Sequence, residues 1–206
     1  MRRILSKFSI FELLVISMAA ALGIAVKPII QPLVRLITGP SMIPGGVIAG
    51  GIYMMFLVLA YGITRKPWAG TLTAIVQAFI VMITGIGSHG PMTILTYTMP
   101  GVAVDLVMFL FYWRAKSGRP RPSVPACFCG GIAANVTGSL LVGVALFDIP
   151  FVPMLLALSA SSLSGGLGGI LAYSLIKQIY ALELIVNEAF DGKYGKYDND
   201  IKDDNK

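Results

Sequence analysis

Six polar side chains stand in or between long apolar stretches of the sequence, and they are the candidates for binding a small solute. They offer amide, imidazole, phenol, carboxylate and hydroxyl groups, which hold a ligand through hydrogen bonds. Ligand pockets are largely apolar with a few placed polar groups, so this set suits a small, mostly neutral heterocycle. The predicted substrate-binding residues are Gln77, His89, Tyr97, Asp105, Asn135 and Ser162.

Asp105 leaves two interpretations open. A carboxylate inside an apolar stretch is a functional-site hypothesis by default, and here it would favour a cationic or amine-bearing ligand or bind a coupling ion. It would be structural if it only accepted hydrogen bonds from Asn135 or from the serines at 159–164, or if it reached toward the cytoplasmic cations. Those serines can also donate to carbonyls of their own helix, so we expect at most one or two of them to face a ligand.

The sequence predicts no catalysis, cofactor or metal centre. The only histidine, His89 in the turn 85–91, and the two cysteines, Cys127 and Cys129, are too few for acid–base catalysis or a thiol metal site. No phosphate-binding G-x-x-x-x-G-K-S/T loop is present. We therefore expect a protein that is not an enzyme and does not hydrolyse ATP itself. For His89, a structural or lid role is open beside ligand binding.

The composition places these residues in a membrane protein. Of the 206 residues, 56% are hydrophobic and 13% are charged, with a mean hydropathy of +0.79, whereas soluble domains carry about 25% charged residues. A helix of about 20 apolar residues crosses a bilayer. We predict an all-α, polytopic fold, a compact bundle of six transmembrane helices near 10–26, 43–63, 68–87, 93–113, 124–147 and 152–176.

Basic residues mark the cytoplasmic side of this bundle. Nine Lys or Arg residues precede the first span or lie between spans two and three or four and five, against two in the opposite connections. The positive-inside rule therefore places both termini in the cytoplasm, and the net charge of +6 reflects this orientation rather than nucleic-acid binding. We predict a multi-pass protein of a bacterial or archaeal cell membrane, with a basic N-terminus (1–9), a substrate-binding transmembrane domain (10–178) and a polar cytoplasmic tail (179–206).

The connection 27–40 after the first span is predicted to lie over the outer mouth of the bundle. It is too short and polar to span a membrane, yet too apolar for bulk water. Pro28, Pro32 and Pro40 should break any long helix there, and the leucines of this segment are expected to pack against the bundle as an interfacial cap.

Small residues four positions apart predict where helices touch. In lipid, helices associate through close packing of small side chains more than through hydrophobicity. Three such pairs are expected to pack inside the bundle: Gly46 and Gly50, Gly165 and Gly169, and Gly130 and Ala134. The first span differs, because Ala21 and Ala25 belong to a helix with more small-residue surface than one neighbour needs. We predict that Ala21 and Ala25 bind a second protein.

Short motifs of the sequence resemble a known family. Six short spans, the small-residue first helix and the run Arg65-Lys66-Pro67-Trp68-Ala69 are similar to the substrate-binding S components of energy-coupling factor (ECF) vitamin transporters. The runs Gly90-Pro91-Met92 and Pro100-Gly-Val-Ala-Val-Asp105 resemble the branch linked to thiamine and its hydroxymethylpyrimidine precursor.

This resemblance implies a division of labour. An S component binds the vitamin with high affinity, a transmembrane T component contacts its first helix, and two ATPase subunits drive import. By this analogy, Ala21 and Ala25 would contact the T component. Two alternatives stay open on the residues alone: an ion-coupled secondary carrier of a small solute that uses Asp105, and a non-transporting scaffold or assembly factor.

Overall fold

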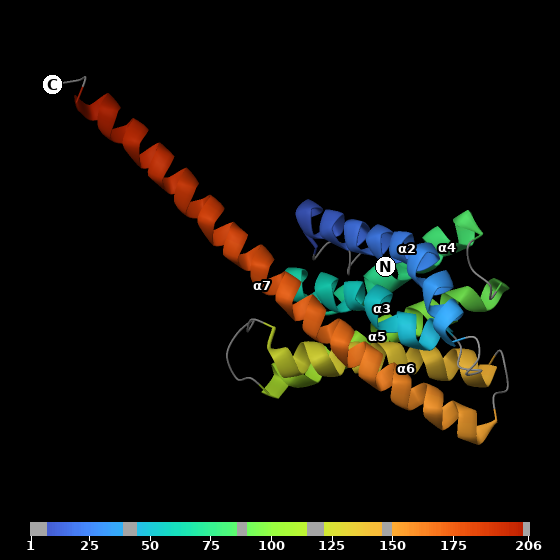
Figure 1. Cartoon of the computed structure of the whole chain (residues 1–206). Helices are drawn as coiled ribbons and strands as arrows, with labels where there is room; N and C mark the ends of the chain where they lie inside the picture. The colour runs from blue at the N-terminus through green and yellow to red at the C-terminus, as the bar shows by residue number, and fades with distance from the viewer. Residues whose placement is uncertain (1–7, 39–44, 86–89, 115–121, 146–149, 204–206) are drawn as a thin grey trace. The chain divides into compact units, whose positions relative to one another are not determined.

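The computed structural model of the chain describes residues 8–38, 45–85, 90–114, 122–145 and 150–203. Over these residues the regular structure is helical, so the predicted all-α fold is confirmed. Figure 1 shows the helices in chain order. Their bounds are α2 Ile10–Thr38, α3 Gly45–Thr64, α4 Ala69–Thr84, η2 Gly90–Met92, α5 Thr93–Arg114, α6 Val124–Ala145 and α7 Phe151–Asp203.

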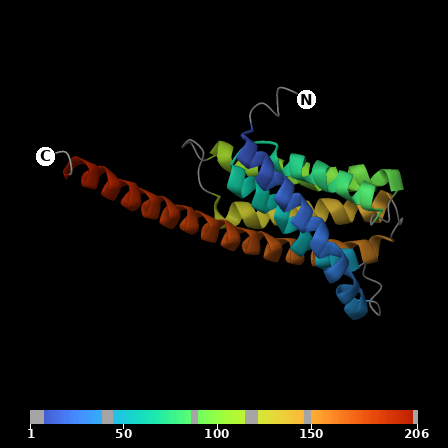
Figure 2. The same ribbon diagram turned by 90° about the horizontal axis from the view of Figure 1, so that it is seen from above.

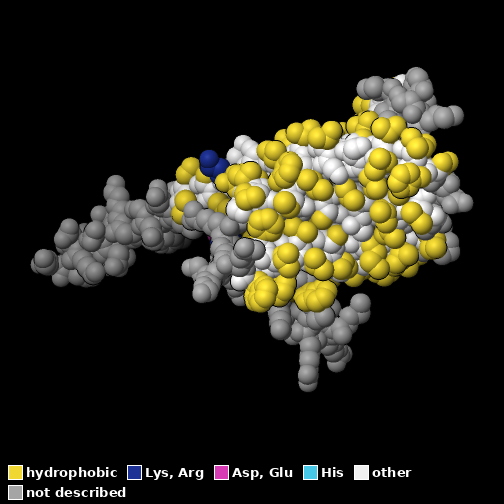
Figure 3. Space-filling model, turned by 90° about the horizontal axis from the view of Figure 1, so that it is seen from below, with side chains coloured by type: hydrophobic (Ala, Val, Ile, Leu, Met, Phe, Trp, Pro, Cys, Tyr) yellow, Lys and Arg dark blue, Asp and Glu magenta, His cyan; other side chains and the backbone are white. Residues whose placement is uncertain are grey.

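Five of these helices, all but α4 and the short η2, are long and apolar enough to cross a membrane. Helix α4 has 16 residues, which at about 1.5 Å per residue is short of the ~30 Å hydrocarbon core of a bilayer. It ends before the predicted span 68–87 does, because Gly85 adopts a left-handed φ of 66° that stops the helix. Hydrophobic side chains spread over the face in Figure 3, as a multi-pass membrane protein requires.

The prediction that prolines break the segment after the first span is wrong for two of the three. Helix α2 continues without interruption with Pro28 and Pro32 inside it, which membrane helices tolerate when nearby groups satisfy the freed carbonyls. Leu33 and Leu36 are 56% and 80% exposed, so these leucines do not pack as a cap against the bundle. Pro40 lies outside the described residues.

Helix α7 extends well beyond the predicted sixth span. It contains 53 residues, and the chain divides into two compact units, Met1–Tyr173 and Ser174–Lys206. No proline follows Pro153, and residues such as Leu, Lys, Glu and Ala favour helix. The polar tail predicted from residue 179 is therefore helical through Asp203.

Backbone contacts between glycines join α3, α6 and α7. A Cβ on Gly168 in α7 would collide with the carbonyl oxygen of Gly51 in α3, and a Cβ on Gly131 in α6 would collide with that of Gly165 in α7. The Gly131 Cβ would also lie 2.8 Å from the backbone nitrogen of Gly169. Only residues without a side chain permit this approach, which stabilises helix pairs in lipid. The internal packing predicted for Gly165 and Gly169 is confirmed.

The remaining helices lie side by side around this contact. Helix α2 packs against α3 and α4, while α5 packs against α4 and α6, an arrangement that Figures 1 and 2 show from two directions. Helices α4 and α5 also approach closely, since a Cβ on Gly101 would lie 2.7 Å from the carbonyl oxygen of Gly70. Close approach through small residues thus recurs throughout the bundle.

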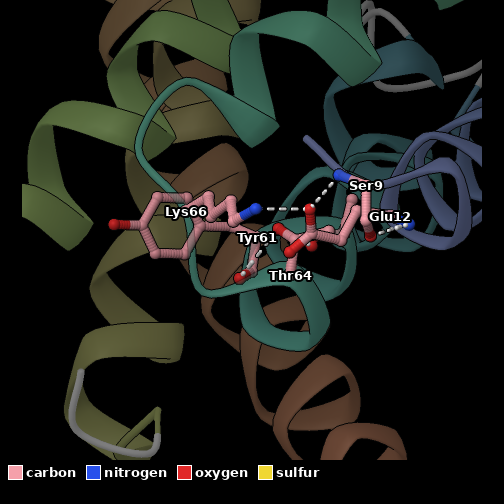
Figure 4. Close-up of polar contacts among 6 residues, drawn as sticks. Ser9, Glu12, Tyr61, Thr64 and Lys66 are labelled. Atoms are coloured by element: carbon pink, nitrogen blue, oxygen red, sulfur yellow. Dashed lines mark hydrogen bonds and ion pairs between the residues drawn. The ribbon is translucent and has the colours of Figure 1, made fainter. Parts of the chain in front are cut away.

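A capping box and an ion pair fix the first turn of α2 (Figure 4). Glu12 Oε2 accepts a hydrogen bond from the backbone nitrogen of Ser9 at 2.7 Å, and Ser9 Oγ accepts one from that of Glu12 at 3.3 Å. The same carboxylate oxygen lies 2.6 Å from Lys66 Nζ, in the connection between α3 and α4. The ion pair joins two segments that the charge pattern places on the cytoplasmic side, in agreement with the predicted topology.

Replacing Gly131 by Ala should destabilise the protein by about 1–3 kcal/mol, because the added Cβ forces α6 and α7 apart. Thermal unfolding in detergent measures the loss. Gly46→Ala is the control, since a Cβ there would lie 3.6 Å from the Tyr53 hydroxyl oxygen, an ordinary contact. Equal stability of the two variants would contradict the packing described above.

Candidate functional site

Gln77 is a buried amide with an unused hydrogen-bond donor. It lies in α4, is 3% exposed, and packs against Gly23 of α2, where a Cβ would collide with Gln77 Nε2. Within the described residues, Nε2 finds no hydrogen-bond acceptor. A buried donor left unpaired costs about 1–3 kcal/mol, so it calls for an explanation. An acceptor atom on a bound solute would pair with this donor, so Gln77 remains a candidate binding residue.

Tyr97, in α5, contacts a lysine outside the predicted set of binding residues. The Tyr97 hydroxyl oxygen accepts a hydrogen bond from the Nζ of Lys27 in α2. The same ammonium lies 4.7 Å from the ring centroid of Tyr97 and 5.6 Å from that of Tyr53 in α3, within the ~6 Å range of cation–π attraction. Tyr97 is 6% exposed and packs in a buried cluster with Ile24 and Val81.

One side of α2 brings Lys27 and Gln77 to the same region. Gly23, which contacts Gln77, and Lys27 are four residues apart and therefore lie on one face of the helix. The carbonyl oxygen of Tyr53 would lie 3.4 Å from a Cβ on Gly23, so Tyr53 lies beside both. Four helices thus supply a polar group that we call the Lys27 cluster: Lys27, Tyr53, Gln77 and Tyr97.

Asp105 lies apart from this cluster in the contacts that it makes. It is 8% exposed, and its carboxylate accepts hydrogen bonds from the backbone nitrogens of Gly70 (3.1 Å) and Thr71 (2.7 Å) and from Thr71 Oγ1 (2.5 Å). These nitrogens belong to the first turn of α4, where the N-cap residue, Trp68, makes no side-chain hydrogen bond. Asp105 therefore caps α4 from the neighbouring helix, which satisfies its free backbone donors.

Asn135 connects three helices in the described structure. It is 2% exposed, and its Nδ2 donates to the carbonyl oxygens of Val47 in α3 (3.0 Å) and Ser161 in α7 (2.9 Å). Its Oδ1 lies against Gly50, where a Cβ would collide with it. Both amide hydrogens are used between helices, so the contacts of Asn135 are those of a packing residue.

The other two predicted binding residues are Ser162 and His89. Ser162 donates to the carbonyl oxygen of Leu158 in its own helix at 2.8 Å, the back-bonding that is common for serine in helices. His89 lies outside the described residues. The structure thus places Tyr97 against Lys27 and Gln77 against Gly23, one turn away on the same face of α2. It gives Asp105, Asn135 and Ser162 partners elsewhere.

One sequence signal could have identified Lys27. An ionisable side chain inside a membrane helix is a functional-site hypothesis by default, and Lys27 lies within the span Ile10–Val34. The expectation that Pro28 ends the first helix placed Lys27 in a connection instead. Because α2 continues, the lysine belongs to the bundle.

The face of α2 that carries Ala21 and Ala25 is exposed. Ala19 and Ala20, in contrast, are buried against the bundle. Large apolar side chains flank the exposed alanines, among them Met18 at 56% exposure. In a bilayer this face meets lipid or another protein.

A family model described as "ABC-type cobalt transport system, permease component" matches residues 12–137. This segment is more than half of the chain and contains the whole Lys27 cluster. The chain belongs to this family. Permease components of transport systems are membrane proteins, which agrees with the apolar helices of the chain. Within the described residues, no group of three or more His, Cys, Asp and Glu side chains that could hold a metal ion occurs.

The fold of this permease family member is similar to that of a solved protein, an S-component of an ECF transporter. The two share 20% sequence identity with a TM-score of 0.68, over 93% of this chain and 98% of the other. At this identity the likeness shows the fold, and it agrees with the S-component architecture that the sequence motifs predicted. No curated protein sequence matches the chain significantly.

Replacing Asp105 by Ala should destabilise the protein by about 1–3 kcal/mol, since buried amides at the start of α4 lose their acceptor. Thermal unfolding in detergent is the measurement, with Asp105→Asn, which keeps one carbonyl oxygen, as the milder variant. An unchanged unfolding temperature together with lost solute transport would instead assign Asp105 to ion coupling.

Proposed function

We infer that this chain is the high-affinity substrate-binding S component of an ATP-driven ECF-type importer. In this function it captures a vitamin or vitamin precursor outside the cell, and a T component with two ATPase subunits drives its import. The observation that carries the proposal is the S-component fold over nearly the full length of both chains. Membership of a transport permease family supports it as well.

The exposed face of α2 supports the proposed partner. Ala21 and Ala25 lie on the side of the helix that the other helices leave uncovered, and small residues allow another helix to approach closely. An isolated bundle needs small side chains only on its packed faces. The T component is the partner we propose for this face.

The proposed substrate is a compound like thiamine or its hydroxymethylpyrimidine precursor. The motifs around Gly90 and Asp105 support this branch through their resemblance. Of the two compounds, the neutral pyrimidine suits the Lys27 cluster better, because its ring nitrogens and hydroxyl accept hydrogen bonds. Thiamine carries a positive charge, which an ammonium group repels.

The contacts of Asp105 favour this proposal over an ion-coupled carrier. A carrier would need Asp105 to bind and release its coupling ion. The carboxylate instead accepts three hydrogen bonds from α4, and these would have to break in each cycle.

Substituting both Ala21 and Ala25 by Leu should reduce copurification of the T component at least tenfold, because the bulkier side chains keep the partner helix away. Solute affinity should stay within twofold. The control is Ser159→Leu, an exposed position on α7 whose hydroxyl bonds only carbonyls of its own helix. Loss of solute binding with the partner still attached would mean that the alanine face serves the bundle instead.

Mass spectrometry of the solute that copurifies with the protein in mild detergent tests the proposed function. We expect one small vitamin or vitamin precursor at close to one molecule per chain. Parallel metal analysis tests the cargo that the family description names. Stoichiometric cobalt without an organic solute, or no bound solute at all, would contradict the proposal.

A further inference from the structure

The Lys27 cluster has a chemical bias that the proposed function does not specify. Its side chains come from four helices, and two of its polar groups, the Lys27 ammonium and Gln77 Nε2, are hydrogen-bond donors. An ammonium has donors and no acceptor, so the Tyr97 oxygen accepts from Lys27. The O–H of Tyr97 can then donate a hydrogen bond to a second group. Gln77 Nε2 adds a buried donor that has no acceptor within the described residues.

Burial within the cluster increases from Lys27 toward Gln77. Lys27 and Tyr53 are half-buried, whereas Tyr97 and Gln77 are 6% and 3% exposed. The charged group therefore lies at the accessible end and the unpaired amide at the deep end. Gln77 lies beside Gly23, one helical turn before Lys27 on α2.

Lys27 lies in a membrane helix, where ionisable side chains are rare. Its burial is costly, and such residues commonly mark a binding site or a transport path. Here the ammonium stacks against two tyrosine rings, a contact worth about 0.5–2 kcal/mol. An anion placed at the same ammonium forms a charge-assisted hydrogen bond, roughly twice as strong as a neutral one. The aromatic contacts therefore contribute to holding Lys27 in place in the absence of the anion.

We propose that Lys27, with the Tyr97 hydroxyl and the Gln77 amide, binds an anionic group of the imported solute, a carboxylate or a phosphate. The anion takes the place of the Tyr97 oxygen at Lys27 Nζ, and the Tyr97 hydroxyl then donates a hydrogen bond to the same anion. The rings of Tyr53 and Tyr97 remain available to pack against the apolar part of the solute. This inference rests on the proposed function and narrows its substrate: the solute is an anionic form of the pyrimidine precursor, such as its phosphate ester, or another vitamin that carries a carboxylate, rather than the neutral pyrimidine itself.

The experiment compares the amount of solute that copurifies with equal amounts of wild-type protein and three lysine variants. Lys27→Met removes the charge and keeps the length, and Lys27→Arg keeps the charge. Lys66→Met is the matched control, a half-buried lysine outside the cluster. The solute extracted from the wild-type protein is identified by mass spectrometry and added back to each stripped variant to measure its affinity.

We expect a solute with a carboxylate or phosphate group. Its affinity should fall at least tenfold in Lys27→Met, less in Tyr97→Phe, and within threefold of wild type in Lys27→Arg and Lys66→Met. Lys27→Arg shows whether loss of binding in Lys27→Met reflects the charge rather than misfolding, and unfolding temperatures of all variants are recorded beside the affinities.

Two results overturn the proposal while leaving the proposed function intact. One is a bound vitamin that has no anionic group, and the other is wild-type affinity in Lys27→Met. If no organic solute copurifies with the wild-type protein, both the proposed function and the anion site are contradicted.

Discussion

The absence of side chains at the contacts between α3, α6 and α7 is the constraint on which the rest of the structure depends. Lipid tails are as apolar as the helices, so burial of leucines gives little reason for helices to associate. The backbones at Gly51 and Gly168, and at Gly131 and Gly165, approach so closely that a methyl group would not fit. Asn135 can reach carbonyls on both neighbouring helices because of this approach. The amide of Asn135 therefore serves helix packing.

The buried polar groups of the bundle fall into two sets, those that join helices and those of the Lys27 cluster. Asp105 accepts three hydrogen bonds from the first turn of α4, and Asn135 donates both of its amide hydrogens to backbone carbonyls. Removing either partner leaves a buried group unsatisfied. The Lys27 cluster differs, since Gln77 keeps an unused donor within the described residues and Lys27 lies half-buried beside two aromatic rings. Selectivity for a solute is therefore expected at α2, α3, α4 and α5 rather than around Asp105.

Much of the fold could be predicted from the sequence, because long charge-free intervals bounded by basic clusters limit where helices can lie. The helices α3, α5 and α6 begin and end within about three residues of the predicted spans. The extent of α2 could not be predicted in this way. Whether a proline ends a membrane helix depends on whether neighbouring groups satisfy the carbonyls that the proline leaves unpaired. Because Pro28 was expected to end the first helix, Lys27 was assigned to a connection and was not among the predicted binding residues. Whether Asn135 faces a ligand or a neighbouring carbonyl depends on helix rotation, which hydrophobic periodicity does not fix when a helix is apolar all round.

The central claim is that this bundle captures a solute and depends on other subunits for energy. Uptake of the copurified solute into sealed vesicles tests it most directly. Vesicles that contain this chain alone should bind the solute and accumulate none of it, with or without an ion gradient. Vesicles that also contain a T component and two ATPase subunits should accumulate it when ATP is supplied. Accumulation by the chain alone, abolished by an uncoupler, would contradict the account.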